Sequence, residues 1–248
     1  MNADKFRELH VPGTPLALYN IWDAGGAKVV AEAGAKAVAT GSWSVAAAHG
    51  YADGEALPFD MLVWIAGRIA ASVNVPLTVD FEAGYAHEPA EIEENAARLF
   101  EAGAVGVNFE DGLNGDVRPA DEQVARLKAV RRGAEKAGVN AFINARTDYF
   151  LRSDPSEHAR HLDEALARAT AYAAAGADGF FAPGLADEAL IKTVCVQSPL
   201  PVNIMTTPAT PSIARLGALG VARVSFGPFP YRKLMKTFEA ECRAATAV

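Results

Sequence analysis

The sequence predicts one α/β domain over residues 1–248, a (β/α)₈ TIM barrel. Its 248 residues with 50% hydrophobic content are enough to bury one large core. Short apolar runs typical of strands lie near 16–22, 37–41, 76–82, 105–110, 141–147, 179–183, 201–205 and 223–227. Helical periodicity fills the intervals 59–73, 88–102, 121–137, 156–175 and 187–197.

Each element follows from a local signal. A short helix is expected at 2–10, and the last helix at about 231–245. Four helices stop at a glycine directly before the next strand, namely at Gly34, Gly103, Gly176 and Gly220. The rival architecture is a doubly wound open sheet, but the glycine-rich dinucleotide fingerprint that would follow its first strand is absent. The repeating unit therefore favours the barrel.

Composition excludes several classes of partner. A formal net charge of −7 and the lack of a basic stripe argue against nucleic acid. No apolar run approaches the roughly 18 residues of a membrane span, and the charged start of the chain has no signal-peptide core. Cys195 and Cys242 have no partner at metal-ligand spacing, which suits a reducing compartment. We expect a cytoplasmic protein that binds neither nucleic acid nor membrane.

Two acids at the end of one predicted strand are the most informative local feature. Leu77, Val79 and Phe81 share one face of the strand, so Asp80 and Glu82 share the other. Two carboxylates about 7 Å apart along a strand repel each other unless a cation lies near them. A hard divalent ion is the natural occupant, since Mg²⁺ is held by one or two carboxylates with water and substrate oxygens. The prediction is Mg²⁺, with Mn²⁺ as the alternative.

The barrel indicates where the chemistry lies, because active sites of this fold gather at the carboxyl ends of the strands. The less apolar strand faces, taken as inward, supply Asn20, Trp22, Asp80, Glu82, Asn108, Glu110, Asn144, Arg146, Asp148, Asn203 and Ser225. Four carboxylates face one guanidinium in this set, and unpaired buried charges are costly. Either the set holds a cation, or Arg146 bridges acids in a purely structural network while the other acids point to water.

These residues resemble the isocitrate lyase/phosphoenolpyruvate mutase superfamily, and most closely its phosphonomutase-like branch. The resemblance runs in order along nearly the whole chain, through the segments 18–24, 79–85, 106–112, 144–148 and 201–203. Its most specific motifs are Asp-x-Glu-x-Gly-Tyr from Asp80 and Asn-Ala-Arg-Thr-Asp from Asn144. The resemblance implies a Mg²⁺-dependent barrel enzyme that acts on a small anionic carboxylate.

The resemblance also implies residue roles. Asp80, Glu82 and Glu110 would hold Mg²⁺ directly or through water, and Arg146 would bind the substrate carboxylate. Asp53 would contact metal-bound water or the reacting group. Tyr85, just after the metal acids, would hydrogen-bond substrate or water, with simple loop packing as the alternative. The expected substrate-binding residues are a loop that offers backbone N–H groups to a carboxylate, together with inward-facing side chains: Gly41, Ser42, Trp43, Trp22, Asn108 and Asn203.

Some family features are missing. The lyases carry a Lys-Lys/Arg-Cys-Gly-His loop after the fourth strand, whereas residues 111–120 contain no Cys, Lys or His. Isocitrate and methylisocitrate lyase activities are therefore not expected. The mutases use a lysine and an asparagine there, for which Asn114 and Arg118 are the only substitutes. A family glutamate after the sixth strand is replaced by the segment 181–184, and Trp43 narrows the substrate loop, which indicates a small substrate.

The first hypothesis is a lyase that cleaves a C–C bond in a small α-keto or α-hydroxy acid through a metal-stabilised enolate, as in an oxaloacetate-type decarboxylase. The second is a phosphoenolpyruvate/phosphonopyruvate mutase or a phosphonopyruvate hydrolase. The third is a barrel that binds metal and carboxylate without catalysis. Better studied relatives add a helical segment that subunits exchange; here the chain stops after one helix, so we expect a plainer homo-oligomer, a dimer or tetramer.

Overall fold

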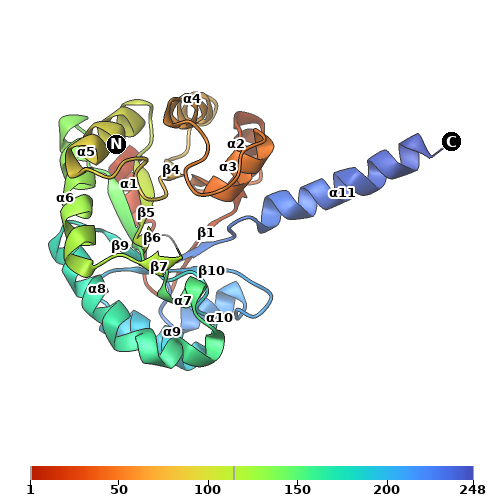
Figure 1. Cartoon of the computed structure of the whole chain (residues 1–248). Helices are drawn as coiled ribbons and strands as arrows, with labels where there is room; N and C mark the ends of the chain where they lie inside the picture. Colours follow the sequence, from red (N-terminus) through yellow and green to blue (C-terminus); the bar gives the residue numbers. More distant parts are fainter. Residues whose placement is uncertain (1, 114, 248) are drawn as a thin grey trace.

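The computed structural model describes residues 2–113 and 115–247. Parallel strands form one sheet in the order β1-β11-β10-β9-β8-β5-β4-β3-β2. Their bounds are β1 (Leu16–Leu18), β2 (Asn20–Ile21), β3 (Val38–Thr40), β4 (Leu77–Asp80), β5 (Gly106–Glu110), β8 (Phe142–Arg146), β9 (Gly179–Phe181), β10 (Val202–Met205) and β11 (Arg223–Ser225). The alternation of these strands with helices confirms the predicted barrel (Figure 1).

The first strand segment closes the barrel because its two halves pair with different strands. The predicted strand 16–22 forms two short strands that are separated by Tyr19. β1 pairs with β11, where Leu16 lies opposite Arg223, and β2 pairs with β3, where Asn20 lies opposite Ala39. The ring of strands is complete because one segment bonds to the last strand with one half and to the second strand with the other.

Helices alternate with the strands, and most of them cover the outside of the ring. They are α1 (Asn2–Glu8), α2 (Ala24–Glu32), α3 (Ser42–Ala48), α4 (Phe59–Ala70), α5 (Pro89–Glu101), α6 (Ala120–Lys136), α7 (Tyr149–Arg152), α8 (Leu162–Ala174), α9 (Glu188–Gln197), α10 (Ile213–Ala218) and α11 (Phe229–Thr246). A small hairpin of β6 (Gly112–Leu113) and β7 (Asp116–Val117) follows β5. The four predicted cap glycines all have left-handed φ angles, between 93° and 110°.

Two local expectations were wrong. The predicted helix 156–175 is a 3₁₀ helix, η1 (Pro155–His161), followed by α8. Asp154 accepts a hydrogen bond from the Ser156 N–H, and His158 is buried against the ring of Phe150, so the first turns follow local contacts rather than the α-helical period. The segment 41–43 is not a loop, because Gly41 is the N-cap of helix α3.

Helix α1 closes the amino end of the barrel. The Phe6 ring is fully buried and meets the rings of His10 and Phe142 edge-on, at centroid distances of 4.7 and 5.6 Å. A Cβ at Gly106 would lie 2.9 Å from the Phe6 ring and from the Phe142 carbonyl, so no larger residue fits there. With this end filled by aromatic side chains, the carboxyl end is left for ligands.

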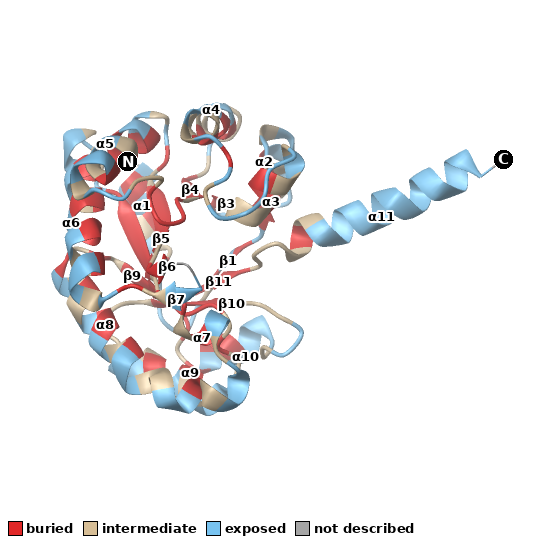
Figure 2. Ribbon diagram, in the orientation of Figure 1, coloured by how far each residue is buried: buried red, intermediate tan, exposed pale blue. Residues whose placement is uncertain are grey.

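The last helix does not join the outer ring. Figure 1 shows α11 running straight out from the barrel, and Figure 2 shows it exposed along almost its whole length. Every described residue from Arg232 onward is exposed, including the apolar side chains of Leu234, Met235 and Phe238. None of the helices within 2–113 and 115–247 is long and apolar enough to cross a membrane.

Candidate active site

Two adjoining cavities open at the carboxyl ends of the strands. The main cavity, of about 440 Å³, is lined by Asn20, Gly41, Ser42, Trp43, Asp53, Asp80, Asn108, Arg146, Leu151, Phe181, Pro183, Met205, Thr207, Ser225, Gly227, Pro228, Phe229 and Arg232. The acidic cavity, of about 370 Å³, is lined by Ser42, Asp53, Gly54, Glu82, Glu110, Arg146, Asp148, Leu151 and Arg152. They share Ser42, Asp53, Leu151 and Arg146. The predicted acids therefore lie beside the space for a substrate.

Asp80, the last residue of β4, has one bonded and one bare carboxylate oxygen. Its Oδ2 accepts a hydrogen bond of 3.0 Å from the Ser42 N–H at the start of α3. Its own N–H donates to Thr40 Oγ1 at 2.9 Å, which fixes the strand end. Oδ1 is buried and has no hydrogen-bond partner among the residues that the structure describes. A buried anionic oxygen without a donor is costly unless a ligand completes it.

Glu82 is held by the chain around it. Its Oε1 accepts from the Tyr85 hydroxyl at 2.6 Å, and its Oε2 accepts from the Glu55 N–H at 2.8 Å. Burial, with repulsion from Asp80 and Asp53, raises the pKa of Glu82 to about 7, although the Tyr85 bond acts in the opposite direction. The carboxylate is therefore oriented but short of positive charge.

The backbone around Glu82 is strained. Glu55, Glu82 and Tyr85 have φ angles of 63°, 50° and 54°, and within the described part of the chain no other residue except glycine has a positive φ. Each such residue costs of the order of 1 kcal/mol, and strain of this kind persists where the surrounding structure enforces it. Tyr85 N–H also donates to Glu55 Oε1 at 2.6 Å, so the two segments hold each other in this conformation.

Arg146 bridges two acids at the far wall of the acidic cavity. Its Nη1 lies 2.5 Å from Glu110 Oε2, and its Nε lies 2.6 Å from Asp148 Oδ1. Burial by itself lowers the pKa of Arg146, but Glu110, Asp148 and Asp80 outweigh it and raise that pKa. Burial raises the pKa of Glu110, against the effect of Arg146. The structural network considered as an alternative thus exists for these three residues, whereas no cation of the described chain is bonded to Asp80 or Glu82.

Asp53 lies on the segment between α3 and α4 and lines both cavities. Burial and, after it, the nearby charge of Asp80 raise the pKa of Asp53. Asp53 is thus a further acid in the same electrostatic cluster.

The predicted substrate-binding residues do not all meet. Gly41, Ser42, Trp43 and Asn108 line the main cavity, but Trp22 and Asn203 line neither cavity. The Trp22 ring packs edge-on against Tyr231 at 4.9 Å, and Asn203 Oδ1 accepts from Ser225 Oγ at 3.3 Å. Two N–H groups expected to face a carboxylate are already bonded, that of Gly41 to Ile21 O and that of Ser42 to Asp80.

The donor set fits a magnesium ion that keeps much of its water. Across residues 2–113 and 115–247 no three His, Cys, Asp or Glu side chains converge as a ready metal site. The reason is visible in the contacts: Glu82 is turned to Tyr85 and Glu110 to Arg146. Mg²⁺ needs only one or two carboxylates when water fills its other positions. The bare Oδ1 of Asp80 satisfies that requirement.

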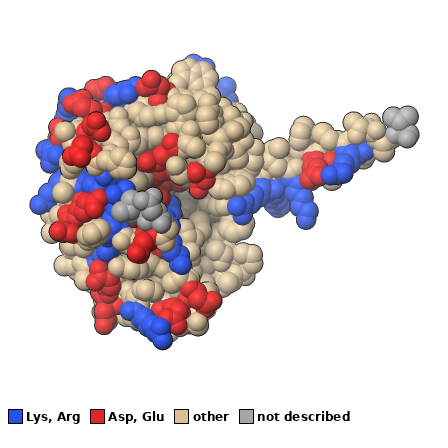
Figure 3. Space-filling model, in the orientation of Figure 1, with Lys and Arg blue, Asp and Glu red and all other residues tan. Residues whose placement is uncertain are grey.

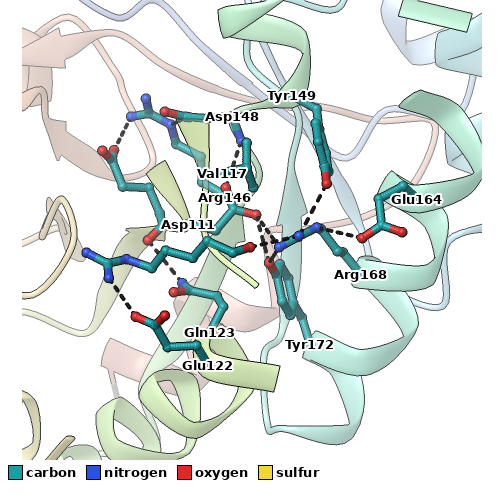
Figure 4. A network of polar contacts seen from close by, with 12 residues as sticks. Asp111, Val117, Glu122, Gln123, Arg146, Asp148, Tyr149, Glu164, Arg168 and Tyr172 are labelled. Carbon is teal, nitrogen blue, oxygen red and sulfur yellow. Dashed lines mark hydrogen bonds and ion pairs between the residues drawn. The ribbon is translucent and has the colours of Figure 1, made fainter. Parts of the chain in front are cut away.

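A second buried network lies directly behind the site and was missed by sequence reasoning (Figure 4). Asp111 accepts hydrogen bonds from the Tyr172 hydroxyl at 2.7 Å, the Asp148 N–H at 2.9 Å and Arg168 Nη1 at 3.2 Å. Arg168 Nη2 donates to the Arg118 carbonyl at 2.8 Å, which ties down the end of the β6–β7 hairpin. An arginine on the otherwise apolar face of α8 was the one signal in the sequence.

Comparisons with known proteins show what this chain is similar to. The family model described as Phosphoenolpyruvate phosphomutase matches residues 6–246. A crystal structure from Burkholderia cenocepacia J2315, named as a candidate phosphonomutase, is 49% identical, covers 98% of each chain and has a TM-score of 0.96. The 2-methylisocitrate lyase of Escherichia coli K12 is 27% identical and covers 98% of this chain and 81% of its own.

A phosphonopyruvate hydrolase solved in complex with oxalate and Mg²⁺ has the same fold, with a TM-score of 0.84. At 19% identity, covering 97% of this chain and 85% of the hydrolase, this similarity concerns the fold alone. The family model spans nearly the whole chain, in agreement with the motifs around Asp80 and Arg146. The chain therefore belongs to the phosphoenolpyruvate phosphomutase family, within the isocitrate lyase/phosphoenolpyruvate mutase superfamily.

Proposed function

We propose that this protein is a Mg²⁺-dependent lyase that cleaves a C–C bond in a small α-keto or α-hydroxy carboxylic acid by way of an enolate. The observation that carries the proposal is the buried, unpartnered Oδ1 of Asp80 in the same cavity as Arg146. A bare anionic oxygen suits a cation, and a fixed guanidinium suits a carboxylate. The two together match the two ends of a small keto acid.

The metal is proposed to lie between Asp80, which lines the main cavity, and Glu82 and Glu110, which line the adjoining acidic cavity. Asp80 would bind Mg²⁺, or Mn²⁺ in its place, while Glu82 and Glu110 would contact its water molecules. When bound, the ion supplies positive charge where negative charge develops during bond cleavage. Support for this assignment comes from the crowding of acids: burial and, after it, repulsion from Asp80 and Asp53 raise the pKa of Glu82.

The chain's own residues orient the substrate. Arg146 would bind the substrate carboxylate, with its guanidinium held at a fixed angle by Glu110 and Asp148. Asp53 would contact the reacting group from the segment after α3. The Tyr85 hydroxyl donates a hydrogen bond to Glu82, so we assign Tyr85 to holding that carboxylate rather than to contacting the substrate.

The wall beside Asp80 would complete the substrate site. Trp43 and Asn108 line the main cavity and would pack against the bound acid. Gly41 and Ser42 shape the same wall, while Trp22 and Asn203 would act indirectly through Tyr231 and Ser225.

The test is turnover by purified protein with Mg²⁺ on a panel of keto, hydroxy and phosphono acids, with release of pyruvate, CO₂ and phosphate followed separately. We expect pyruvate or CO₂ release by the wild type and its loss in Asp80→Ala. The matched control is Asp121→Ala, which removes an exposed acid at the start of α6. Unchanged Mg²⁺ affinity of Asp80→Ala in titration calorimetry would contradict the proposal.

Phosphonate chemistry is the second candidate, because the matching family model and a relative with 49% identity carry mutase names. Phosphate release alone from phosphonopyruvate would favour the hydrolase, and interconversion with phosphoenolpyruvate the mutase. Of the two suggested loop residues, Asn114 lies outside the described residues, and the Arg118 guanidinium is bonded to Glu122 at 2.7 Å and lines neither cavity. Mg²⁺-dependent oxalate binding without any turnover would favour the non-catalytic barrel.

We also propose a homo-oligomer in the cytoplasm. The exposed apolar side chains of Leu234, Met235 and Phe238 on the projecting α11 support association with a second copy. Light scattering on the eluting protein is expected to give a dimer or tetramer mass. Serine replacement of these three residues should shift the mass towards the monomer, and an unchanged mass would contradict the role of α11.

A further inference from the structure

We infer that the substrate carries an uncharged, apolar group on the side remote from its carboxylate. This inference rests on the proposed function and specifies its substrate class. The main cavity has two unlike walls, and only one of them is used by the acids and Arg146. The other wall selects for hydrocarbon.

The two walls belong to different sectors of the barrel. The charged groups Asp80 and Arg146 come from β4 and β8, with Asp53 beside them. The apolar wall is built at the carboxyl ends of the next two strands, β9 and β10, with Phe181 on β9 paired in register with Arg146 on β8. Neighbouring segments add further apolar side chains to this wall. Its members are Leu151, Phe181, Pro183, Met205 and Phe229.

This wall is tightly held in place. A Cβ at Gly184, which has a φ of 89°, would lie 2.3 Å from the Phe150 carbonyl, so only glycine allows the turn after Pro183 to pack on α7. A Cβ at Gly227 would lie 2.6 Å from Met205 Sδ, so the Met205 side chain crosses over a glycine. A larger residue at either glycine would displace the apolar side chains of this wall.

The cavity is larger than the reacting part of the proposed substrate. A pyruvate-sized acid has six heavy atoms and fills at most about 180 Å³ if each takes no more than the roughly 30 Å³ of a liquid water. The main cavity measures about 440 Å³, so more than half would stay empty. The sequence suggested that Trp43 narrows the site. Its ring instead packs against two residues of the last helix: it lies under Arg232, 4.3 Å from the guanidinium carbon, and next to Tyr231.

Charge excludes a second carboxylate at the apolar wall. Among the described residues lining the main cavity, the cations are Arg146 and Arg232. Arg146 is already bonded to two acids, and Arg232 is exposed on α11 at the mouth. Figure 3 shows the basic side chains of α11 gathered where this helix leaves the barrel. An anion is thus attracted at the entrance, but a second carboxylate inside the cavity would lose its water and meet the hydroxyls of Thr207 and Ser225 rather than a free cation.

The inference is tested by Mg²⁺-dependent binding of unbranched 2-oxo acids of increasing length, from pyruvate to 2-oxohexanoate, with oxalate as the reference. Each methylene that reaches the apolar wall should lower Kd about threefold to fourfold, the ratio for ~0.8 kcal/mol per buried CH₂. 2-Oxoglutarate should bind more weakly than 2-oxopentanoate, which has the same chain length without the distal carboxylate. The opposite order, or a Kd that does not depend on length, would overturn the inference.

Two variants separate this inference from the proposed function. Met205→Ala should abolish the dependence on chain length and leave oxalate binding unchanged, since β9 separates Met205 on β10 from Arg146 on β8. Met205→Lys should reverse the preference in favour of 2-oxoglutarate, with Met205→Leu as the conservative control. If the wild type does not bind oxalate in the presence of Mg²⁺, both proposals are wrong. If it binds oxalate but its affinity for 2-oxo acids does not rise with chain length, only this inference is wrong.

Discussion

Asp111, which is buried, and Asp80, which is half-buried, are acids at the ends of neighbouring strands, and their hydrogen-bond partners differ. Asp111 receives hydrogen bonds from a tyrosine, a backbone N–H and the guanidinium of Arg168. Asp80 receives one from a backbone N–H and keeps a bare oxygen. The difference shows that this fold can supply a full set of hydrogen-bond donors to an acid whose role is structural. The incomplete set around Asp80 therefore indicates a place for a ligand.

The largest expected effect comes from removing the cation of the completed region. Arg168→Met leaves Asp111 buried without its guanidinium and frees the Arg118 carbonyl. Breaking a buried pair from one side typically costs about 3–5 kcal/mol, so we expect a loss of this size in the free energy of unfolding. Urea denaturation measures it.

Lys136→Met is the matched control, because Lys136 pairs with Glu94 on the exposed side of α6 and α5. This variant should keep the wild-type unfolding midpoint, as exposed pairs contribute little. Equal losses in both variants would mean that the Asp111 region has no special structural weight.

Asp80→Asn should act in the opposite sense. The substitution removes one charge from a cluster of repelling acids, so without metal the free energy of unfolding should stay the same or rise. Wild-type protein at a Mg²⁺ concentration of 100 times Kd should gain about 2.7 kcal/mol, and the variant should gain none. Melting curves with and without Mg²⁺ decide the matter, with Asp121→Asn as the control. A Mg²⁺ gain retained by Asp80→Asn would place the ion elsewhere.

His10 offers a smaller test at the closed end of the barrel. Burial, followed by repulsion from Arg223 and Arg7, lowers the pKa of His10 from 6.5 to about 3, although its bond to the Phe6 carbonyl acts the other way. The unfolded chain therefore binds more protons than the folded one below pH 6.5, and stability falls as the pH falls. Between pH 7.5 and 5 this single residue should account for about 2 kcal/mol.

The variant His10→Gln should lose about 2 kcal/mol less than the wild type over that pH range, as measured by urea denaturation at both pH values. His87→Gln, which changes an exposed histidine, serves as the control and should keep the wild-type pH dependence. A parallel loss in His10→Gln and the wild type would show that His10 accepts a proton in the folded state.

The sequence predicted features that have a short-range pattern. Glycines such as Gly103 marked helix ends correctly, because the left-handed backbone found there is favourable for glycine and for few other residues. Alternation along β4 was enough to separate Asp80 from the apolar face of the strand. Resemblance to a family added Asp53 and gave Arg146 its expected role, and both residues line the main cavity together with Asp80.

Features that depend on distant partners were not predicted. Asp111 and Arg168 are 57 positions apart, and nothing near either residue announces the other. The orientation of Glu82 depends on a strained Glu55 from another segment. The apolar wall near Phe181 needs several segments to meet, so the sequence alone did not show it.

The divided first strand has a consequence for synthesis of the protein. Residues 16–18 find their partner only in residues 223–225, so most of the polypeptide must leave the ribosome before the ring can shut. Until then, the sheet has two edge strands whose N–H and C=O groups face solvent. Such edges can pair with strands of other chains. A nascent or truncated product that stops before Arg223 should therefore depend on chaperones far more than the finished protein does.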